Sequence, residues 1–200
     1  MAILSGTIWK LWNGTYSDVY NDALFGTVGD DRIYGLGGND HLYGNKGNDY
    51  IDGGRGADVM NGGEGSDTFV FKFGESTLAA PDTIEDFTHA YTTMLLSPGA
   101  VASPAADHID AAVAGSYSNY QEWNVQGVVN NHGYDSLLQV GASAYMANLN
   151  ANGAGLKYLF VTDGHDGYLF ADLDGNGLAD SAMILKGAST LGAFDYHDII

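Results

Sequence analysis

The most regular pattern along the chain is a large apolar residue at every ninth position between residues 26 and 70. The residues that carry it are Ile33, Leu42, Ile51, Met60 and Phe69. Glycine, aspartate and asparagine fill most of the positions between them, which leaves room only for very short strands. A flexible glycine-rich linker has no reason to keep this spacing. The pattern therefore predicts a stack of short strands, each pointing one apolar side chain inward.

The same stretch is an internal repeat of nine residues. Its five copies share glycine at positions 1 and 4, aspartate at position 6 and the apolar residue at position 8. They are GTVGDDRIY (26–34), GLGGNDHLY (35–43), GNKGNDYID (44–52), GGRGADVMN (53–61) and GGEGSDTFV (62–70). A degenerate copy at 17–25, SDVYNDALF, keeps the aspartate and apolar columns without the glycines. We interpret it as a first, poorly liganded turn.

The columns have a chemical meaning. Glycine permits backbone geometries with positive φ and a close approach of carbonyl groups, and aspartate supplies a hard oxygen that suits an ion such as Ca²⁺. Positions 7–9 form a short strand, so two nonapeptides make one 18-residue turn of a flattened, right-handed coil. Loops from every second repeat then stack on the same side.

Stacking brings like charges together. Strands in a sheet lie about 4.8 Å apart, so the pairs Asp31/Asp49, Asp40/Asp58 and Asp49/Asp67 are neighbours. At an effective dielectric constant near 20, the repulsion is about 3 kcal/mol per pair. The inward side chains must also offset an ordering cost of about 1–2 kcal/mol per residue. The sequence therefore predicts that this roll does not fold without its metal.

The composition of the chain limits the kinds of molecule that it can bind. The chain has 25 acidic residues against 7 Lys and Arg, a formal charge of −18, which argues against nucleic acid and anionic membranes as partners. With 45% hydrophobic residues it can nevertheless build a core. It has no cysteine, so metal ligands must be oxygen or imidazole. We find no apolar run long enough to insert in a membrane and no cleavable signal peptide at the N-terminus.

The repeats resemble the RTX repeats, GGxGxDxUx, of bacterial toxins, proteases and lipases exported by type I secretion. The resemblance implies several Ca²⁺ ions between loops n and n+2, bound by position-6 carboxylates and by backbone carbonyls of the glycine-rich positions. The implied ligands are Asp31, Asp40, Asp49, Asp58 and Asp67, with Gly29, Gly38, Gly47, Gly56 and Gly65. Thr27 and Asn45 replace the second glycine of the family pattern in the first and third repeats. Ion binding through backbone carbonyls tolerates both replacements.

The segments after the repeats extend the resemblance. Glu75 and Asp82 are the nearest carboxylates that could complete the last loop, and the stretch is similar to the one after the repeats in serralysin-type metalloproteases. The final residues 194–200, FDYHDII, look like the uncleaved C-terminal signal of type I secretion substrates. The resemblance therefore implies a secreted, extracellular protein of a Gram-negative bacterium, with the type I exporter as a partner.

We predict an all-β fold, in which a right-handed parallel β-roll held together by Ca²⁺ is followed by an antiparallel β-sandwich or meander with one short helix. The expected divisions are an N-terminal cap (1–25), the roll (26–74) and a C-terminal β region (75–200). In that region we expect the helix at 104–115 and strands at 123–129, 136–140, 158–161, 168–171 and 182–185. The loop at 172–180 resembles an EF-hand loop but has Met183 where the bidentate Glu belongs, so it is either a Ca²⁺ site or a plain hairpin turn.

No motif indicates catalysis. The zinc-protease signature H-E-x-x-H and the G-x-S-x-G elbow are both missing from the sequence. The leading hypothesis is a non-enzymatic, secreted calcium-binding protein that folds on meeting extracellular Ca²⁺. One alternative is a separately encoded secretion and folding module of an exoenzyme, with a secreted enzyme as partner. Another is a calcium-dependent adhesion element with a partner at the cell surface.

Overall fold

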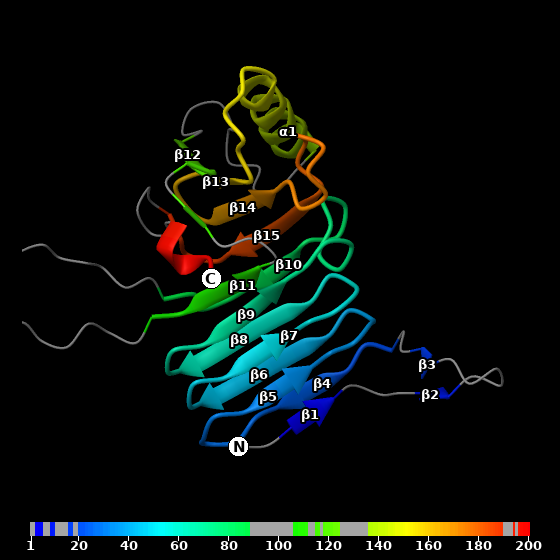
Figure 1. The fold of residues 1–200 in the computed structure, drawn as a ribbon. Coiled ribbons are helices and arrows are strands. Elements are labelled where there is room, and N and C mark those ends of the chain that lie inside the picture. The colour runs from blue at the N-terminus through cyan, green and yellow to red at the C-terminus, as the bar shows by residue number, and fades with distance from the viewer. Residues whose placement is uncertain are drawn as a thin grey trace, which may run out of the picture.

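The computed structural model describes residues 3–5, 9–10, 16–17, 20–88, 106–111, 115–116, 118–124, 136–189, 194 and 196–200. Two β-sheets face one another over most of the length of the molecule, and a single long helix lies at the end farthest from the N-terminus (Figure 1). No helix among these residues has the length and apolar character needed to cross a membrane.

The repeats form the predicted parallel β-roll. Successive strands alternate between the two sheets, and each pairs in parallel with the strand two places along the chain. The strands are β4 (Ala23–Phe25), β5 (Arg32–Tyr34), β6 (His41–Lys46), β7 (Tyr50–Asp52), β8 (Val59–Glu64) and β9 (Thr68–Phe71). Strand β1 (Ile3–Ser5) pairs with β5, and β2 (Trp9–Lys10) with β3 (Tyr16–Ser17) makes a separate small ribbon.

The position-8 side chains form the core between the sheets. Ile33, Ile51 and Phe69 are in register in one sheet, and Leu42 and Met60 in the other. All five are 0% exposed, as the ninth-residue spacing predicts. Because a strand alternates its side chains between two faces, only the middle residue of each three-residue strand enters this core.

The coil continues past the last nonapeptide. Strand β10 (Asp82–Ile84) pairs in parallel with β8, and β11 (His108–Ala111) pairs in parallel with β9. Ile84 and Ile109 take the inward positions in register with Met60 and Phe69, and both are fully buried. The roll therefore adds two strands whose sequences lack the glycine columns.

The predicted C-terminal meander is present and extends one sheet of the roll. Strands β13 (Tyr158–Thr162), β14 (Gly167–Ala171) and β15 (Ser181–Leu185) are antiparallel neighbours. Strand β15 then pairs in parallel with β10, which joins the meander to β8, β6 and β4 in one eight-stranded sheet. Strand β12 (Tyr120–Asn124) adds to the outer edge beside β13.

The predictions for residues 104–140 were partly wrong. The segment His108–Ala111 is strand β11 and not part of a helix, because its pairing with the edge of β9 overrides local propensity. Residues 136–140 are not a strand but the first turns of α1 (Ser136–Ala151). The strand expected at 123–129 overlaps β12 at its first two residues, and 125–129 lie outside the described residues.

Helix α1 covers the far side of the meander. Ala142, Met146 and Leu149 recur at helical spacing and pack with Leu159, Val161, Tyr168 and Phe170. Strands β13 and β14 are thus buried on both faces, since their alternate residues belong to the core between the sheets. A short 3₁₀ helix, η1 (Tyr196–Asp198), precedes the C-terminus.

Candidate calcium sites along the roll

The position-6 aspartates form a ladder along each side of the roll. One carboxylate oxygen, Oδ1, of Asp40, Asp49, Asp58 and Asp67 accepts the backbone N–H of the aspartate 18 residues earlier. The donor–acceptor distances are 2.7 Å from Asp31 N to Asp49 Oδ1, 2.8 Å from Asp49 N to Asp67 Oδ1 and 2.8 Å from Asp40 N to Asp58 Oδ1. The degenerate first turn joins the same ladder, because Asp22 N donates to Asp40 Oδ1 at 2.7 Å.

The second carboxylate oxygen is the informative one. The Oδ2 atoms of Asp49, Asp58 and Asp67 are buried and have no hydrogen-bond partner among the described residues. A buried carboxylate oxygen that nothing satisfies costs several kcal/mol unless a cation neutralises it. These oxygens fit a hard cation such as Ca²⁺, which prefers carboxylate and carbonyl oxygens.

The position-1 glycines make space beside these oxygens. A Cβ built at Gly44, Gly53 or Gly62 would overlap the Oδ2 atom of the aspartate five residues later in the same loop. A carbonyl oxygen from the loop 18 residues on lies against the same space at Gly44, where it is Gly62 O. Carboxylate and carbonyl oxygens thus meet at the position where a side chain is missing.

The electrostatics of the ladder favour a bound cation or proton. Burial raises the pKa of Asp58 to about 6, and the charge of Asp40 adds to the rise. Burial likewise raises the pKa of Asp67 to about 6, with a further contribution from Asp49. The pKa of Asp49 is also raised, by burial and by the carboxylates of Asp31 and Asp30. The backbone N–H bonds oppose these shifts without cancelling them.

The position-4 glycines allow the loops to stack closely. Gly38, Gly47, Gly56 and Gly65 have φ between 123° and 152°, and a Cβ at Gly56 or Gly65 would overlap the carbonyl oxygen of Gly38 or Gly47. Gly29 is different, because it has no positive φ and its Cβ would meet nothing within 4 Å. At position 2, Leu36 and Asn45 take the left-handed conformation with φ of 76° and 75°.

A second ladder at position 5 was not predicted from the sequence. Here the side-chain oxygen accepts the backbone N–H of the residue 18 positions later, opposite in direction to the position-6 ladder. The donor–acceptor distances are 2.8 Å for Asn39 N to Asn21, 2.8 Å for Asn48 N to Asp30, 3.0 Å for Ala57 N to Asn39 and 2.9 Å for Ser66 N to Asn48. In the sequence, position 5 holds Asn or Asp in only some of the repeats. This is a weaker signal of a ladder than the invariant aspartate at position 6.

Asp82 and Glu75 lie at the end of one stack. Asp82 takes the place of the next position-6 aspartate, because Asp58 N donates to its Oδ1 at 3.0 Å and β10 follows it. Burial raises the pKa of Asp82 well above its ordinary value, and the charges of Asp58 and Glu75 add to this. Glu75 also raises the pKa of Asp58. The structure therefore brings Glu75, Asp58 and Asp82 close enough to interact.

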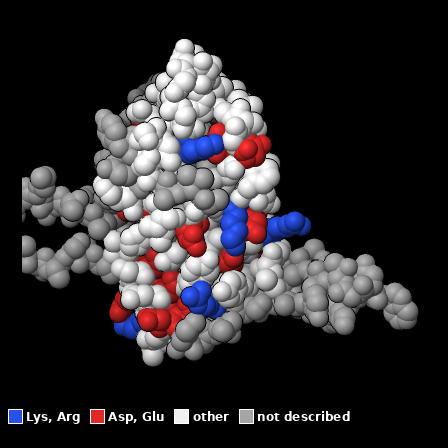
Figure 2. All heavy atoms as spheres, viewed as in Figure 1, with Lys and Arg blue, Asp and Glu red and all other residues white. Residues whose placement is uncertain are grey.

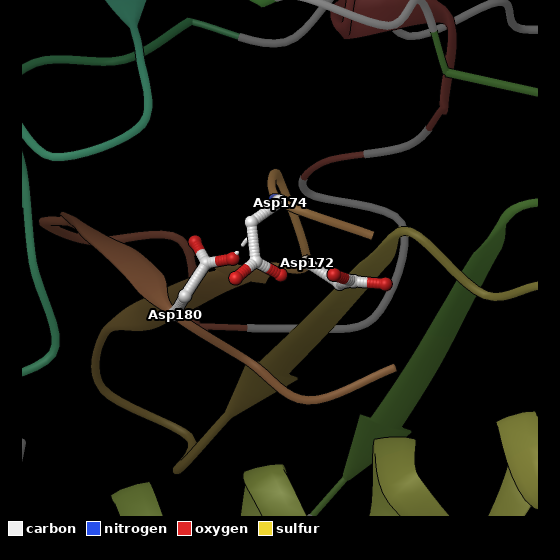
Figure 3. Close-up of side chains that lie close together, drawn as sticks. All are labelled: Asp172, Asp174 and Asp180. Carbon is white, nitrogen blue, oxygen red and sulfur yellow. Dashed lines mark hydrogen bonds between the residues drawn. The ribbon is translucent and has the colours of Figure 1, made fainter. Parts of the chain in front are cut away.

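The acidic cluster Asp172, Asp174 and Asp180 lies in the loop between β14 and β15, with carboxylate oxygens within 4.8 Å of one another (Figure 3). Its oxygens already accept hydrogen bonds. Lys157 Nζ contacts Asp172 Oδ2 at 3.1 Å, and Asp180 Oδ2 accepts two backbone N–H groups of Leu173 and Asp174. The loop is thus held by its own hydrogen bonds and by a lysine. The structure thus shows a hairpin loop between β14 and β15 whose three carboxylates are close enough together to share a cation.

Charged side chains are unevenly distributed over the surface of the molecule. On the face shown in Figure 2, acidic side chains are spread over the lower half of the molecule, where the roll lies, and Lys and Arg side chains lie among them. The helix at the opposite end, α1, has no charged residue in its sequence. The roll therefore carries both acidic and basic side chains on its surface, whereas α1 carries neither.

Comparison with known proteins defines the class to which this arrangement belongs. The model of the RTX calcium-binding nonapeptide repeat matches residues 16–51 and 37–69. Residues 16–69 are therefore RTX repeats, which bind Ca²⁺ and are typical of secreted proteins of Gram-negative bacteria. No curated protein matches the chain significantly.

Two solved structures from Azotobacter vinelandii resemble the chain loosely. They are the AlgE6R3 and AlgE6R2 subunits of a mannuronan C5-epimerase. AlgE6R3 is 25% identical with a TM-score of 0.47, and the match covers 90% of this chain and 78% of that one. AlgE6R2 is 22% identical with a TM-score of 0.38, covering 90% and 87%. At these TM-scores the likeness adds nothing to the fold or the function derived above.

Proposed function

We propose that this chain is a secreted, non-enzymatic protein that folds when its repeats bind several extracellular Ca²⁺ ions. The observation that carries the proposal is the set of buried carboxylate oxygens without a hydrogen-bond partner at Asp49, Asp58 and Asp67. At neutral pH, where these carboxylates are ionised, a cation that lies against them offsets the cost of their burial. The ion is thus part of what makes the roll stable.

The proposed ligands follow the repeat columns. They are the carboxylates of Asp31, Asp40, Asp49, Asp58 and Asp67 and the backbone carbonyls of Gly29, Gly38, Gly47, Gly56 and Gly65. Glu75 and Asp82 complete the last loop on the Asp58 side, which their mutual charge interactions support. In this proposal the roll at 26–74 folds first, and residues 75–200 assemble on it through β10.

Calcium dependence suits export by a type I exporter. Extracellular modules bind Ca²⁺ with dissociation constants of about 10⁻⁴–10⁻³ M, well above the calcium concentration in the cytosol. Carboxylate repulsion therefore keeps the chain extended before export, and Ca²⁺ binding stabilises the folded state afterwards by mass action. Because each ion is shared by two loops, folding should be steep in calcium concentration.

Far-UV circular dichroism during a Ca²⁺ titration from zero to about 10 mM tests this proposal, since that range spans the expected affinities. We expect a sharp transition from a disordered to a β-rich spectrum with Ca²⁺ and none with Mg²⁺, which keeps its waters and demands octahedral geometry. A chain already folded in EDTA at pH 8, or one indifferent to Ca²⁺ at that pH, would overturn the proposal.

A further inference from the structure

A groove lies between the C-terminal end of α1 and the loop that joins β14 to β15. Its volume is about 550 Å³, within the range of about 300–1,000 Å³ typical of small-molecule sites. Three segments of the chain form its walls. They are the last turn of α1 with the residues after it (147–155), the start of β13 (156–157) and the loop 172–178. None of these segments belongs to the repeats, so the groove is separate from the proposed ion sites.

One side chain fixes the walls of the groove relative to one another. Asn150 Oδ1 accepts the N–H of Leu156 at 2.6 Å, and Asn150 Nδ2 donates to Leu156 O at 3.0 Å and to Gly177 O at 3.2 Å. Asn150 thus joins the end of α1 both to β13 and to the loop after β14. Walls that are already tied together lose little conformational freedom when a ligand enters, which favours binding.

An ion pair lies in the wall of the groove. Lys157 Nζ is 3.1 Å from Asp172 Oδ2, and the two side chains are 29% and 3% exposed. Asp172 also accepts the N–H of Gly175 at 2.7 Å and that of Gly177 at 3.1 Å. The ammonium group of Lys157 has three N–H donors, and in the described part of the chain only Asp172 accepts from it. Lys157 can therefore donate to a ligand without leaving Asp172.

The charge of the groove favours a neutral ligand. Among the described residues that line it, only Lys157 and Asp172 are charged, and they neutralise one another. A cationic ligand would have to compete with Lys157 for Asp172. An anionic ligand would approach Asp172 on a chain whose formal charge is −18. A neutral ligand that accepts hydrogen bonds from Lys157 avoids both costs.

The rest of the wall consists of aliphatic side chains and glycine backbone. The aliphatic residues are Ala147, Ala151, Leu156 and Leu178. In the described chain no aromatic side chain lines the groove, so a flat aromatic ligand has no ring on which to stack. At Gly175 a Cβ would lie 3.5 Å from Lys157 Nζ, so the missing side chain leaves space beside the ammonium group. These surfaces suit a compact, saturated ligand that carries hydroxyl groups.

We propose that this groove binds a neutral, polyhydroxylated ligand of the sugar class. Its hydroxyl oxygens accept from Lys157, its hydroxyl groups donate to backbone carbonyls of the glycine-lined wall, and its C–H groups lie against the aliphatic residues. The proposal goes beyond calcium binding, because no residue of the groove is a proposed calcium ligand. It gives the C-terminal half of the chain a binding activity of its own.

NMR titration of the isotope-labelled full chain in Ca²⁺ tests both the site and its charge preference. The neutral probes are the methyl glycosides of glucose, mannose and galactose, and the charged probes are glucuronate and glucosamine. Each is added to about 50 mM, which detects dissociation constants in the millimolar range. We expect at least one neutral glycoside to shift the amide signals of the groove glycines, Gly153, Gly155, Gly175 and Gly177. No such shift with any neutral glycoside, or tighter binding of a charged probe, would overturn the proposal.

A lysine substitution tests the hydrogen-bond donor. Lys157→Met should weaken binding of the neutral glycoside roughly tenfold or more, because a hydrogen bond from a charged donor is lost. Lys186→Met is the matched control, since Lys186 Nζ pairs with Asp166 Oδ2 at 2.8 Å in the same way but does not line the groove. Equal affinities in the two variants would overturn the site. The titration of the wild type decides the question if Lys157→Met does not fold.

Discussion

At the scale of the residue, the position-6 aspartate uses its two oxygens differently. Oδ1 joins neighbouring turns through a backbone N–H, and in Asp49, Asp58 and Asp67 Oδ2 is buried without such a partner. A neutral asparagine keeps the first role, because its amide oxygen also accepts a hydrogen bond. Asparagine weakens the second role, the binding of a cation, because it carries no negative charge.

The substitution Asp49→Asn separates these roles. We expect the midpoint calcium concentration for folding to rise roughly tenfold or more, equivalent to a loss of about 1.4 kcal/mol in ion binding. Asp30→Asn is the control, since it makes the same charge change at a position where other turns carry Asn39 and Asn48 and keeps the acceptor for Asn48 N. Circular dichroism in a Ca²⁺ titration measures both, and equal midpoints would contradict the assignment of Asp49.

The position-4 glycines offer a second test at this scale. Gly56→Ala should prevent the roll from stacking, because its Cβ would overlap the carbonyl oxygen of Gly38 at a φ of 145°. Gly29→Ala belongs to the same column but meets nothing within 4 Å. We expect it to fold with Ca²⁺ as the wild type does. Folding of Gly56→Ala at ordinary calcium concentrations would show that the loops stack less closely than described.

At the scale of the element, the aspartate stack binds protons as well as ions. Burial raises the pKa of Asp107 to about 7 and those of Asp58 and Asp67 to about 6, above the value near 4 of an unfolded chain. The ion-free roll therefore holds protons more tightly than the unfolded chain, so its stability rises as the pH falls through 7 and 6. Calcium must displace these protons.

The midpoint calcium concentration for folding should consequently be lower at pH 5.5 than at pH 8, because the unfolded chain is already deprotonated in this range while protons stabilise the folded roll. In EDTA the same trend is expected, with the ion-free chain gaining β structure as the pH is lowered from 8 to 5.5. Circular dichroism at both pH values, with and without Ca²⁺, measures these trends. A midpoint independent of pH would show that the carboxylates do not titrate in this range.

The strands of the roll could be predicted from the sequence because their period is invariant. The ninth-residue spacing defines which side chain of each strand enters the core, and all five of those residues are buried. Strand β11 (His108–Ala111) was not predicted, because its sequence matches the repeat only at Asp107 and Ile109. It has no glycines at the repeat positions and does not follow the last repeat at a nine-residue spacing. Short apolar runs such as SLLQV at 136–140 fit a helix or a strand equally well, so periodicity alone does not decide between them.

At the scale of the whole molecule, the roll, the meander and the C-terminus share one core. Phe194 lies in that core, with ring centroids 5.4 Å from Phe87, 5.3 Å from Phe160 and 6.2 Å from Tyr120. Tyr120 Oη also donates to Phe194 O at 2.9 Å. Phe194, Asp198 and Ile199, from the stretch that resembles an export signal, are therefore buried parts of the folded body.

Phe194→Ala tests this shared core. We expect a loss of about 3–5 kcal/mol in the free energy of unfolding in Ca²⁺, the usual range for a buried phenylalanine. Phe25→Ala is the control, because Phe25 is 59% exposed and stacks on Tyr43 at the surface. Urea denaturation monitored by fluorescence measures both. Equal losses would show that the C-terminal residues do not belong to the core.

The alternation of strands between two sheets limits how the length of such a chain can change. Removing one nonapeptide would transfer every later strand to the opposite sheet, including β10, through which the meander is attached. Removing two consecutive nonapeptides would shorten the roll by one turn and leave each later strand in its own sheet. The sequence repeats every nine residues, but the smallest insertion or deletion that preserves the connection to the C-terminal half is eighteen.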